Sequence, residues 1–195
     1  MNQTYEKLQK YMDKGAALQH AMGLFGWDAE TLAPEKSLEK TAKTIGILSS
    51  EYFSTLVNPE VKELLEELKG AEDLTEVQKA VVDKMAEDVR NLEVIPPEEY
   101  QAYSELTSRS TAVWVKAREE NDFTSFCPVL KEIITYQKKF AGYMAKEGQK
   151  KYDALLEQYE KGFGMEQLDE FFGMLKKEIV PLLREVSRKN DTIDK

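Results

Sequence analysis

Residues 114–130 join the end of one predicted helix to the start of the next. They read Trp-Val-Lys-Ala-Arg-Glu-Glu-Asn-Asp-Phe-Thr-Ser-Phe-Cys-Pro-Val-Leu. The spacing of their apolar residues predicts an amphipathic helix that runs to about Glu120 and stops at Asn121-Asp122. Asparagine and aspartate favour such a stop because their side chains hydrogen-bond to the nearby backbone.

The second half of this stretch predicts the start of a new helix. Ser125 is the residue type that caps a helix amino terminus, and Pro128 fits the first turn that follows. Phe123 and Phe126 are expected to turn inward. The stretch therefore predicts two consecutive helices and contains no obvious catalytic residue.

Apolar residues recur at steps of three and four along nearly the whole chain, which is the period of a helix that buries one face. In the amino-terminal half, the predicted elements are a helix over Gln3 to Leu24, a break over Gly26 to Pro34, a helix carrying Leu38 to Leu56, and a short helix from Asn58-Pro59 to Gly70. The next predicted helix opens with the capping box Thr75-Glu76-Val77-Gln78. Its apolar stripe consists of Val77, Val81, Met85, Val89 and Leu92. In the rest, they are a long helix after Pro96-Pro97, a helix from Ser125 to Gly148, a helical turn over Tyr152 to Tyr159 and a last helix from Leu168.

The last helix is expected to bury a stripe of large apolar residues. Its members are Leu168, Phe171, Phe172, Leu175, Ile179, Leu182 and Val186. Pro181 lies inside the helix, so a kink is expected near Lys177 or Glu178. We find no alternating strand, fixed-period repeat or low-complexity tract. The predicted fold is all-α, with about eight helices in a single helical domain or segment over residues 1–195.

Composition argues against several classes of partner. The 195 residues carry 36 acidic and 27 basic side chains, for a formal charge of -9, so a nucleic acid or an anionic membrane would on average be repelled. The basic stretch from Lys146 to Lys151 is typical of a solvated helix end. Cys127 is the only cysteine, and neither a signal peptide nor a membrane-spanning run is evident. A cytoplasmic protein without nucleic-acid or membrane partners is expected.

Candidate catalytic residues are few. His20, the only histidine, lies near the edge of an apolar stripe and has no second histidine with which to share a metal. Cys127 has no neighbouring histidine to activate it and is read as a small buried hydrophobe. Gly162 and Gly164 lack the lysine and hydroxyl of a phosphate-binding loop.

The segment Gly26-Trp27-Asp28 allows two interpretations. A tryptophan in a helix break is often anchored in a pocket, and the adjacent acidic pair of Asp28 and Glu30 would then be of functional interest. The structural alternative makes Trp27 a core plug and Asp28 the cap of the next turn.

Four separated segments together resemble the amino-terminal part of the carboxypeptidase Taq (M32) metallocarboxypeptidases. They are residues 114–130, Gly26-Trp27-Asp28-x-x-Thr31-x-x-Pro34, residues 152–162 reading Tyr-Asp-Ala-Leu-Leu-Glu-Gln-Tyr-Glu-Lys-Gly, and the helix from Leu168 to Leu183 with Ile179-Val180-Pro181-Leu182-Leu183 near its end. The resemblance covers nearly the whole chain. Ala33-Pro34-Glu35-Lys36 departs from the glycine- and proline-rich turn of many relatives.

The resemblance implies a mostly helical fold with a deep groove and a zinc or cobalt ion at its floor. The full-length enzyme would remove amino acids one at a time from the carboxyl end of peptides with broad specificity, and would form a homodimer. In the family, a His-Glu-x-x-His helix and a downstream glutamate hold the metal, and the glutamate of the motif activates the metal-bound water. This sequence contains neither that motif nor a His-Pro-Phe segment.

No catalytic residue, metal ligand or cofactor is therefore carried over to this chain. The matching positions are expected to be groove-side or structural: Trp27, Asp28, Thr31, Tyr152, Asp153, Tyr159 and Glu160. We expect an amino-terminal segment that is inactive by itself, whether an engineered piece, a proteolytic remnant or the product of a shortened gene. The alternatives are a stand-alone helical interaction module without enzymatic activity and, more weakly, a metal-binding four-helix-bundle enzyme.

Overall fold

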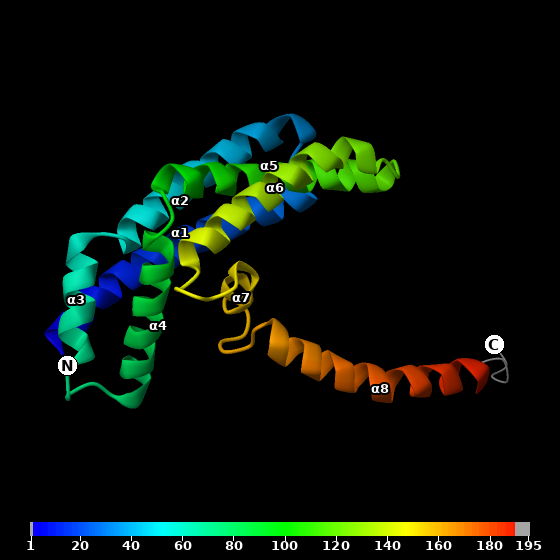
Figure 1. The fold of residues 1–195 in the computed structure, drawn as a ribbon. Helices are drawn as coiled ribbons and strands as arrows, with labels where there is room; N and C mark the ends of the chain where they lie inside the picture. The colour runs from blue at the N-terminus through cyan, green and yellow to red at the C-terminus, as the bar shows by residue number, and fades with distance from the viewer. Residues whose placement is uncertain (1, 190–195) are drawn as a thin grey trace. The chain divides into compact units, whose positions relative to one another are not determined.

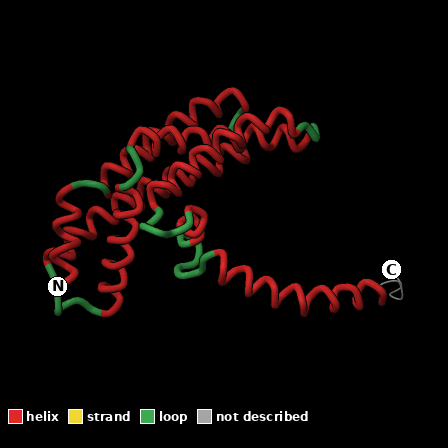
Figure 2. Tube along the Cα trace, viewed as in Figure 1, coloured by secondary structure: helices red, strands yellow, loops and turns green. Residues whose placement is uncertain are grey.

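The computed structural model describes residues 2–189, which divide into two compact units after Phe140. Eight α-helices and one short 3-10 helix make up the described part of the chain, and these residues contain no strand (Figure 1). Short loops join the helices (Figure 2). The all-α prediction with about eight helices is confirmed.

The first unit is a helical array. Its elements are α1 (Gln3–Thr31), η1 (Glu35–Ser37), α2 (Leu38–Leu56), α3 (Pro59–Lys69), α4 (Glu76–Glu93), α5 (Pro97–Glu119) and most of α6 (Phe123–Met144). Helix α2 packs against α1 on one side and α5 on the other, while α3 packs between α1 and α4. These packings make two regions, a three-helix cluster of α1, α3 and α4 and a layer of α1, α2 and α5 (Figure 1).

The three-helix cluster holds the principal hydrophobic core. Leu8 of α1 and Val61 of α3 have no exposed surface, and Val82 of α4 is 1% exposed. The other buried members of this core are Leu56, Leu64, Leu65, Leu68, Leu74, Met85 and Val89. The predicted stripe of α4 is partly wrong, because Val77 is 73% exposed and Val82 takes a buried place instead.

Local capping signals fix the starts of α3 and α4 as predicted. The Asn58 side chain accepts a hydrogen bond from the Val61 amide at 3.0 Å, and Pro59 occupies the first turn. In the capping box of α4, the Thr75 hydroxyl accepts from the Gln78 amide while the Gln78 side chain accepts from the Thr75 amide. Each cap satisfies backbone N–H groups that have no partner inside the helix.

The predicted break at Gly26 is wrong, because α1 continues through it to Thr31. A glycine inside a helix costs about 1 kcal/mol relative to alanine, which a long helix with tertiary contacts tolerates. The helix ends where the amides of Leu32 and Ala33 both donate to the Asp28 carbonyl, just before Pro34. Proline disfavours the helical conformation of the residue before it, so the stop lies near Pro34 and not at Gly26.

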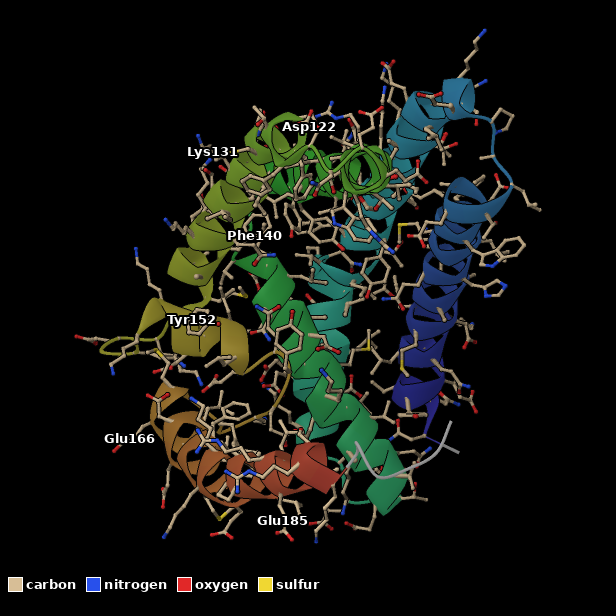
Figure 3. The ribbon with its side chains drawn as sticks, turned by 90° about the vertical axis from the view of Figure 1, so that its right-hand side faces the viewer. Asp122, Lys131, Phe140, Tyr152, Glu166 and Glu185 are labelled. Atoms are coloured by element: carbon tan, nitrogen blue, oxygen red, sulfur yellow. The ribbon has the colours of Figure 1, made fainter. Side chains whose placement is uncertain are left out.

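The junction of α5 and α6 differs from prediction in its cap. Helix α5 ends as expected, and Asn121 adopts a left-handed conformation with φ 53°. Asp122, which is labelled in Figure 3, caps α6 in place of Ser125. Its Oδ1 accepts from the amides of Thr124 at 3.0 Å and Ser125 at 3.3 Å. The helix therefore begins at Phe123, which is 65% exposed and not turned inward as predicted. It ends at Met144 and not at Gly148.

Helices α2 and α5 approach closely at Gly46. A Cβ atom built there would overlap the side chain of Glu105, whose Cδ lies 2.7 Å away. On its other side α5 meets α6 through rings, since Tyr103 lies 5.1 Å from Phe140 between centroids in an edge-on arrangement. The carboxylate of Glu99 and the ammonium of Lys139 add an ion pair of 2.9 Å between the same helices.

Replacing Gly46 with alanine is expected to lower the free energy of unfolding by about 1–2 kcal/mol, because the new methyl group displaces Glu105 from a packed interface. The same substitution in a Glu105→Ala background is expected to stabilise the protein by up to about 1 kcal/mol, since alanine is the better helix former. Urea unfolding of the four variants measures both effects. Equal effects of Gly46→Ala in the two backgrounds would contradict the assigned contact.

In the second unit, α7 (Lys151–Leu156) and α8 (Met165–Lys189) follow the last residues of α6. The Lys146 ammonium pairs with the Glu157 carboxylate at 3.5 Å within this unit. The predicted burial of the α8 stripe is wrong in this structure, since no residue of α8 is buried. Helix α8 begins three residues before Leu168 and continues through Pro181. The kink near Lys177 or Glu178 stays a prediction.

Candidate functional site

The predicted site residues fall into two groups, one in each unit. Trp27, Asp28 and Thr31 lie on the last turns of α1, where the Thr31 hydroxyl donates to the Trp27 carbonyl at 2.7 Å. Trp27 is 59% exposed, so its interpretation as a core plug is wrong. Asp28 is half-buried and holds the helix end through its backbone carbonyl, not as a side-chain cap of the next turn.

The second group comes from α7 and the loop that follows it. Asp153 is the best-anchored member, because its Oδ1 accepts from the Met165 amide at 2.8 Å and so connects α7 to the first residue of α8. Tyr152, which lies on α7 (Figure 3), is 59% exposed, and Tyr159 is 88% exposed. Glu160 contributes its backbone carbonyl, which accepts from the Phe163 amide at 3.2 Å.

Gly164 completes the start of α8. Its amide donates to the Gln167 side chain at 3.1 Å, and a Cβ atom there would lie 3.2 Å from Asp153. A carboxylate next to the first amides of a helix is stabilised by those amides and by the helix dipole. Asp153 therefore has a clear structural role, whereas the two exposed tyrosines are available to a partner or ligand.

A cleft of about 400 Å³ lies between α1, α2 and α5, beside the turn that carries Trp27. Hydroxyl groups dominate its α5 wall, which is formed by Tyr100, Ser104, Thr107, Ser108 and Thr111. From the facing helices, the lining residues are Met22, Gly26, Ala29, Glu30, Ile45 and Ser49. The cleft has the hydrogen-bonding groups to hold a small polar ligand.

Several of these hydroxyls already have partners within their own helices. The Ser104 hydroxyl donates to the Tyr100 carbonyl at 3.0 Å, and Ser49, which is 2% exposed, donates to the Gly46 carbonyl at 2.9 Å. Their oxygens keep free lone pairs, so they offer acceptors to a ligand more than donors. Burial raises the pKa of Tyr100 to about 12, with a smaller contribution from the negative charge of ionised Tyr52.

A second cleft of about 520 Å³ lies between α1, α2 and α4 and is mainly apolar. Its polar groups are paired, since Gln19 donates to the Tyr52 hydroxyl at 2.9 Å and Lys84 pairs with Asp88 at 2.5 Å. Burial raises the pKa of Tyr52, and the nearby Asp88 charge raises it further. The hydrogen bond to Asp88 raises the pKa of Lys84.

Neither cleft brings together a nucleophile and a base. His20 is exposed, and Cys127 is half-buried without a disulfide. Within residues 2–189, no three or more His, Cys, Asp or Glu side chains are grouped so as to hold a metal ion. No helix among the same residues is long and apolar enough to cross a membrane.

Sequence reasoning missed the hydroxyl wall of α5. Its signal is the spacing of Tyr100, Ser104, Thr107 and Thr111 at steps of three and four, which places polar groups on one helical face. Such a stripe normally marks a solvent-facing side. Here the facing helices α1 and α2 turn it into the wall of a cleft.

Comparisons with known proteins point to one family. The curated relatives include Carboxypeptidase 1 of Bacillus subtilis, which is 33% identical over 195 residues, and Thermostable carboxypeptidase 1 of Pyrococcus furiosus, which is 32% identical over 185 residues. The alignments cover 98% and 95% of this chain but only 38% and 37% of those proteins. The chain thus spans well under half the length of the relatives it matches.

Solved structures give the same result for the fold. The structure called BsuCP superposes with a TM-score of 0.91 and 30% identity, over 95% of this chain and 37% of that one. The structure of Pyrococcus furiosus carboxypeptidase has a TM-score of 0.78 and 33% identity, over 97% of this chain and 38% of that one. The resemblance to an amino-terminal portion is confirmed. Since the sequence model of the carboxypeptidase Taq (M32) metallopeptidase family matches residues 7–195, the chain belongs to that family.

Proposed function

We propose that this chain forms the amino-terminal helical part of a metal-dependent carboxypeptidase that removes carboxyl-terminal amino acids from peptides with broad specificity. The observation that carries the proposal is the family match over residues 7–195. The superposition on BsuCP supports it, because nearly the whole chain shares the arrangement of a much longer protein. Residues 1–195 would act as a single helical segment of that enzyme.

Under this proposal, the predicted positions would either contact the peptide substrate or stabilise the residues that do. Trp27 and Tyr159 are large and exposed, so they would contact a peptide or a neighbouring part of the enzyme. Asp28 and Thr31 would support the surface around Trp27, and Asp153 would support the surface around Tyr159, through the helix ends they hold. Tyr152 and Glu160 belong to the same α7 region.

We propose that the chain by itself does not hydrolyse peptides. Its single histidine excludes a His-Glu-x-x-His motif, and the described residues do not fit a metal ion. In the complete enzyme, the zinc or cobalt of the family would polarise the peptide carbonyl and activate water. The whole enzyme is proposed to be a cytoplasmic homodimer; the single cysteine fits a reducing compartment.

The proposed alternative is a stand-alone helical interaction module. The exposed apolar side chains of α8, such as Leu182 at 60% and Leu183 at 61%, favour it, because exposed apolar surface of this kind usually marks an interaction site. Both functions predict the same helices. The two functions differ in one prediction: only the first expects this chain to replace the matching part of an active carboxypeptidase.

A chimera separates the two functions. This chain would replace the matching 38% of Bacillus subtilis Carboxypeptidase 1, and release of carboxyl-terminal amino acids from a short peptide would be measured with zinc or cobalt present. The chimera is expected to be active and to lose its activity with a chelator. The 195-residue chain alone is expected to release no amino acid above background under the same conditions.

The unaltered Bacillus protein and a chimera lacking the segment serve as positive and negative controls. A folded, metal-loaded chimera without activity would favour the interaction module. Chelator-sensitive activity of the isolated chain would overturn the proposal that it is inactive by itself.

A further inference from the structure

The cleft between α1, α2 and α5 has walls from three helices of the same unit. Helix α2 packs against both α1 and α5, so these walls are held by contacts within this chain (Figure 1). The volume of about 400 Å³ lies within the range of about 300–1,000 Å³ that is typical of small-molecule sites. The cleft is therefore large enough for a small organic group and not only for single water molecules.

The charge of the cleft has one sign. Glu30 is the only charged residue among the described residues that line it, and its carboxylate accepts hydrogen bonds but donates none. The formal charge of -9 on the whole chain has the same sign. A cleft lined by negative charge attracts cations and repels anions, so the electrostatics favour a cationic ligand.

The hydroxyl groups of the cleft favour a ligand that donates hydrogen bonds. Besides Ser49 and Ser104, Thr107 also uses its hydroxyl proton within its own helix, donating to the carbonyls of Tyr103 at 3.0 Å and Ser104 at 3.1 Å. The oxygens of these three hydroxyls can then only accept from a ligand. A primary ammonium group matches them, because it carries three N–H donors and no acceptor.

Tyr100 and the apolar lining residues suit the rest of such a ligand. Among the described residues, none hydrogen-bonds to the Tyr100 hydroxyl, whose oxygen can therefore accept from an ammonium group. An aromatic ring also attracts a cation that lies within about 6 Å of its centre. Met22, Ala29 and Ile45 provide apolar surface on the facing helices, against which an alkyl chain can pack.

We propose that the cleft between α1, α2 and α5 binds a primary ammonium group carried on a short alkyl chain. Glu30 supplies the opposite charge, the hydroxyl oxygens accept the N–H groups, and the apolar residues contact the carbon chain. Two sources share this chemistry, the side chain of lysine and the amino terminus of a peptide. The proposal goes beyond the proposed function and does not depend on peptidase activity.

Three probes of similar size and different charge test the site. The 195-residue chain would be titrated with n-butylammonium, n-butanol and butyrate, and amide chemical shifts would be followed by NMR. Butylammonium is expected to shift the amides of residues 104–111 saturably, with a Kd of about 1–10 mM, since so small a ligand supports only weak binding. Butanol is expected to bind at least about fivefold more weakly, and butyrate is expected to cause no saturable shift.

Two results of this titration overturn the proposal. One is a butylammonium shift that does not saturate by about 100 mM, which would show that the cleft has no specific site. The other is butyrate or butanol binding as tightly as butylammonium, which would show that the positive charge is not recognised.

Glu30→Gln tests the role of the carboxylate, and Glu6→Gln is its matched control. Both residues are exposed and belong to α1, so neither change disturbs the core, and they lie about 36 Å apart along the helix. Glu30→Gln is expected to weaken butylammonium about fivefold and to leave butanol unchanged. Glu6→Gln is expected to change neither, and circular dichroism checks helix content. Equal effects of the two substitutions would reflect only the net charge of the chain and would overturn the site.

Two further ligands separate the sources of the ammonium group. N-acetyl-lysine methylamide carries only the side-chain ammonium, and alanine methylamide carries only the α-ammonium. Tighter binding of the first assigns the cleft to lysine side chains, and tighter binding of the second assigns it to amino termini. The lysine compound is expected to bind more tightly, because its unbranched chain can lie along Met22 and Ile45.

Discussion

Replacing Leu8 with alanine is expected to lower the free energy of unfolding of the first unit by about 2–5 kcal/mol. Leu8 has no exposed surface and belongs to the core that α1 shares with α3 and α4. The substitution removes buried apolar atoms and leaves a cavity that rigid neighbouring helices fill only in part. Urea unfolding followed by circular dichroism measures the change, with the midpoint falling while the slope stays constant.

Leu24→Ala is the matched control because it makes the same change in the same helix. Leu24 is 55% exposed, so its truncation is expected to change stability by no more than about 0.5 kcal/mol. The contrast isolates burial from helix propensity. A Leu8→Ala variant as stable as Leu24→Ala would show that α1 does not pack on α3 and α4 in solution.

Tyr100 is expected to make the protein lose stability in strongly alkaline solution. Its pKa is raised by burial to about 12 in the folded protein, against an ordinary value of 10.0. The folded state therefore keeps the phenolic proton at pH values where the unfolded chain has lost it. This contribution is complete below pH 10 and disappears as the pH rises through 12, and it amounts to at most about 3 kcal/mol.

The Tyr100→Phe variant isolates this effect, because it keeps the ring that lies 5.5 Å from Phe53 between centroids and removes only the ionisable group. Unfolding free energies measured from about pH 9 to pH 12 are expected to fall less steeply in the variant than in the unaltered protein. Tyr52, Tyr11 and the lysines titrate in both proteins and cancel in the comparison. Identical slopes would show that the Tyr100 hydroxyl is hydrated in the folded state.

Local signals in the sequence account for the correct predictions. The caps at Asn58 and Thr75 were predictable because each depends on residues within three positions of the helix start. The errors arise where two local signals compete. At the start of α6, both Asp122 and Ser125 are suitable caps, and the position of the helix decides between them. At Gly26, the cost of one glycine is too small to stop a helix.

The clefts were beyond prediction for a different reason. Tyr100 and Ser49 line the same cleft although they are far apart in the sequence and belong to different helices. Their proximity follows from the close packing of α2 on α5. Gly46 permits this close packing because a Cβ atom at that position would overlap Glu105. Of the predicted site positions, the structure connects Trp27 to Thr31 within α1 and Asp153 to the start of α8.

The sequence by itself determined the helical class, most helix boundaries and the family. The apolar periodicity, the helix caps and the family segments each depend on residues that are close together in the sequence. Only the tertiary structure decided which apolar stripes are buried. The stripe of α8 has the same periodicity as the core-forming face of α3, yet Val61 is buried and Leu183 is exposed. Periodicity shows that a helix has an apolar face, whereas burial depends on a second surface that lies elsewhere in the chain or in a partner.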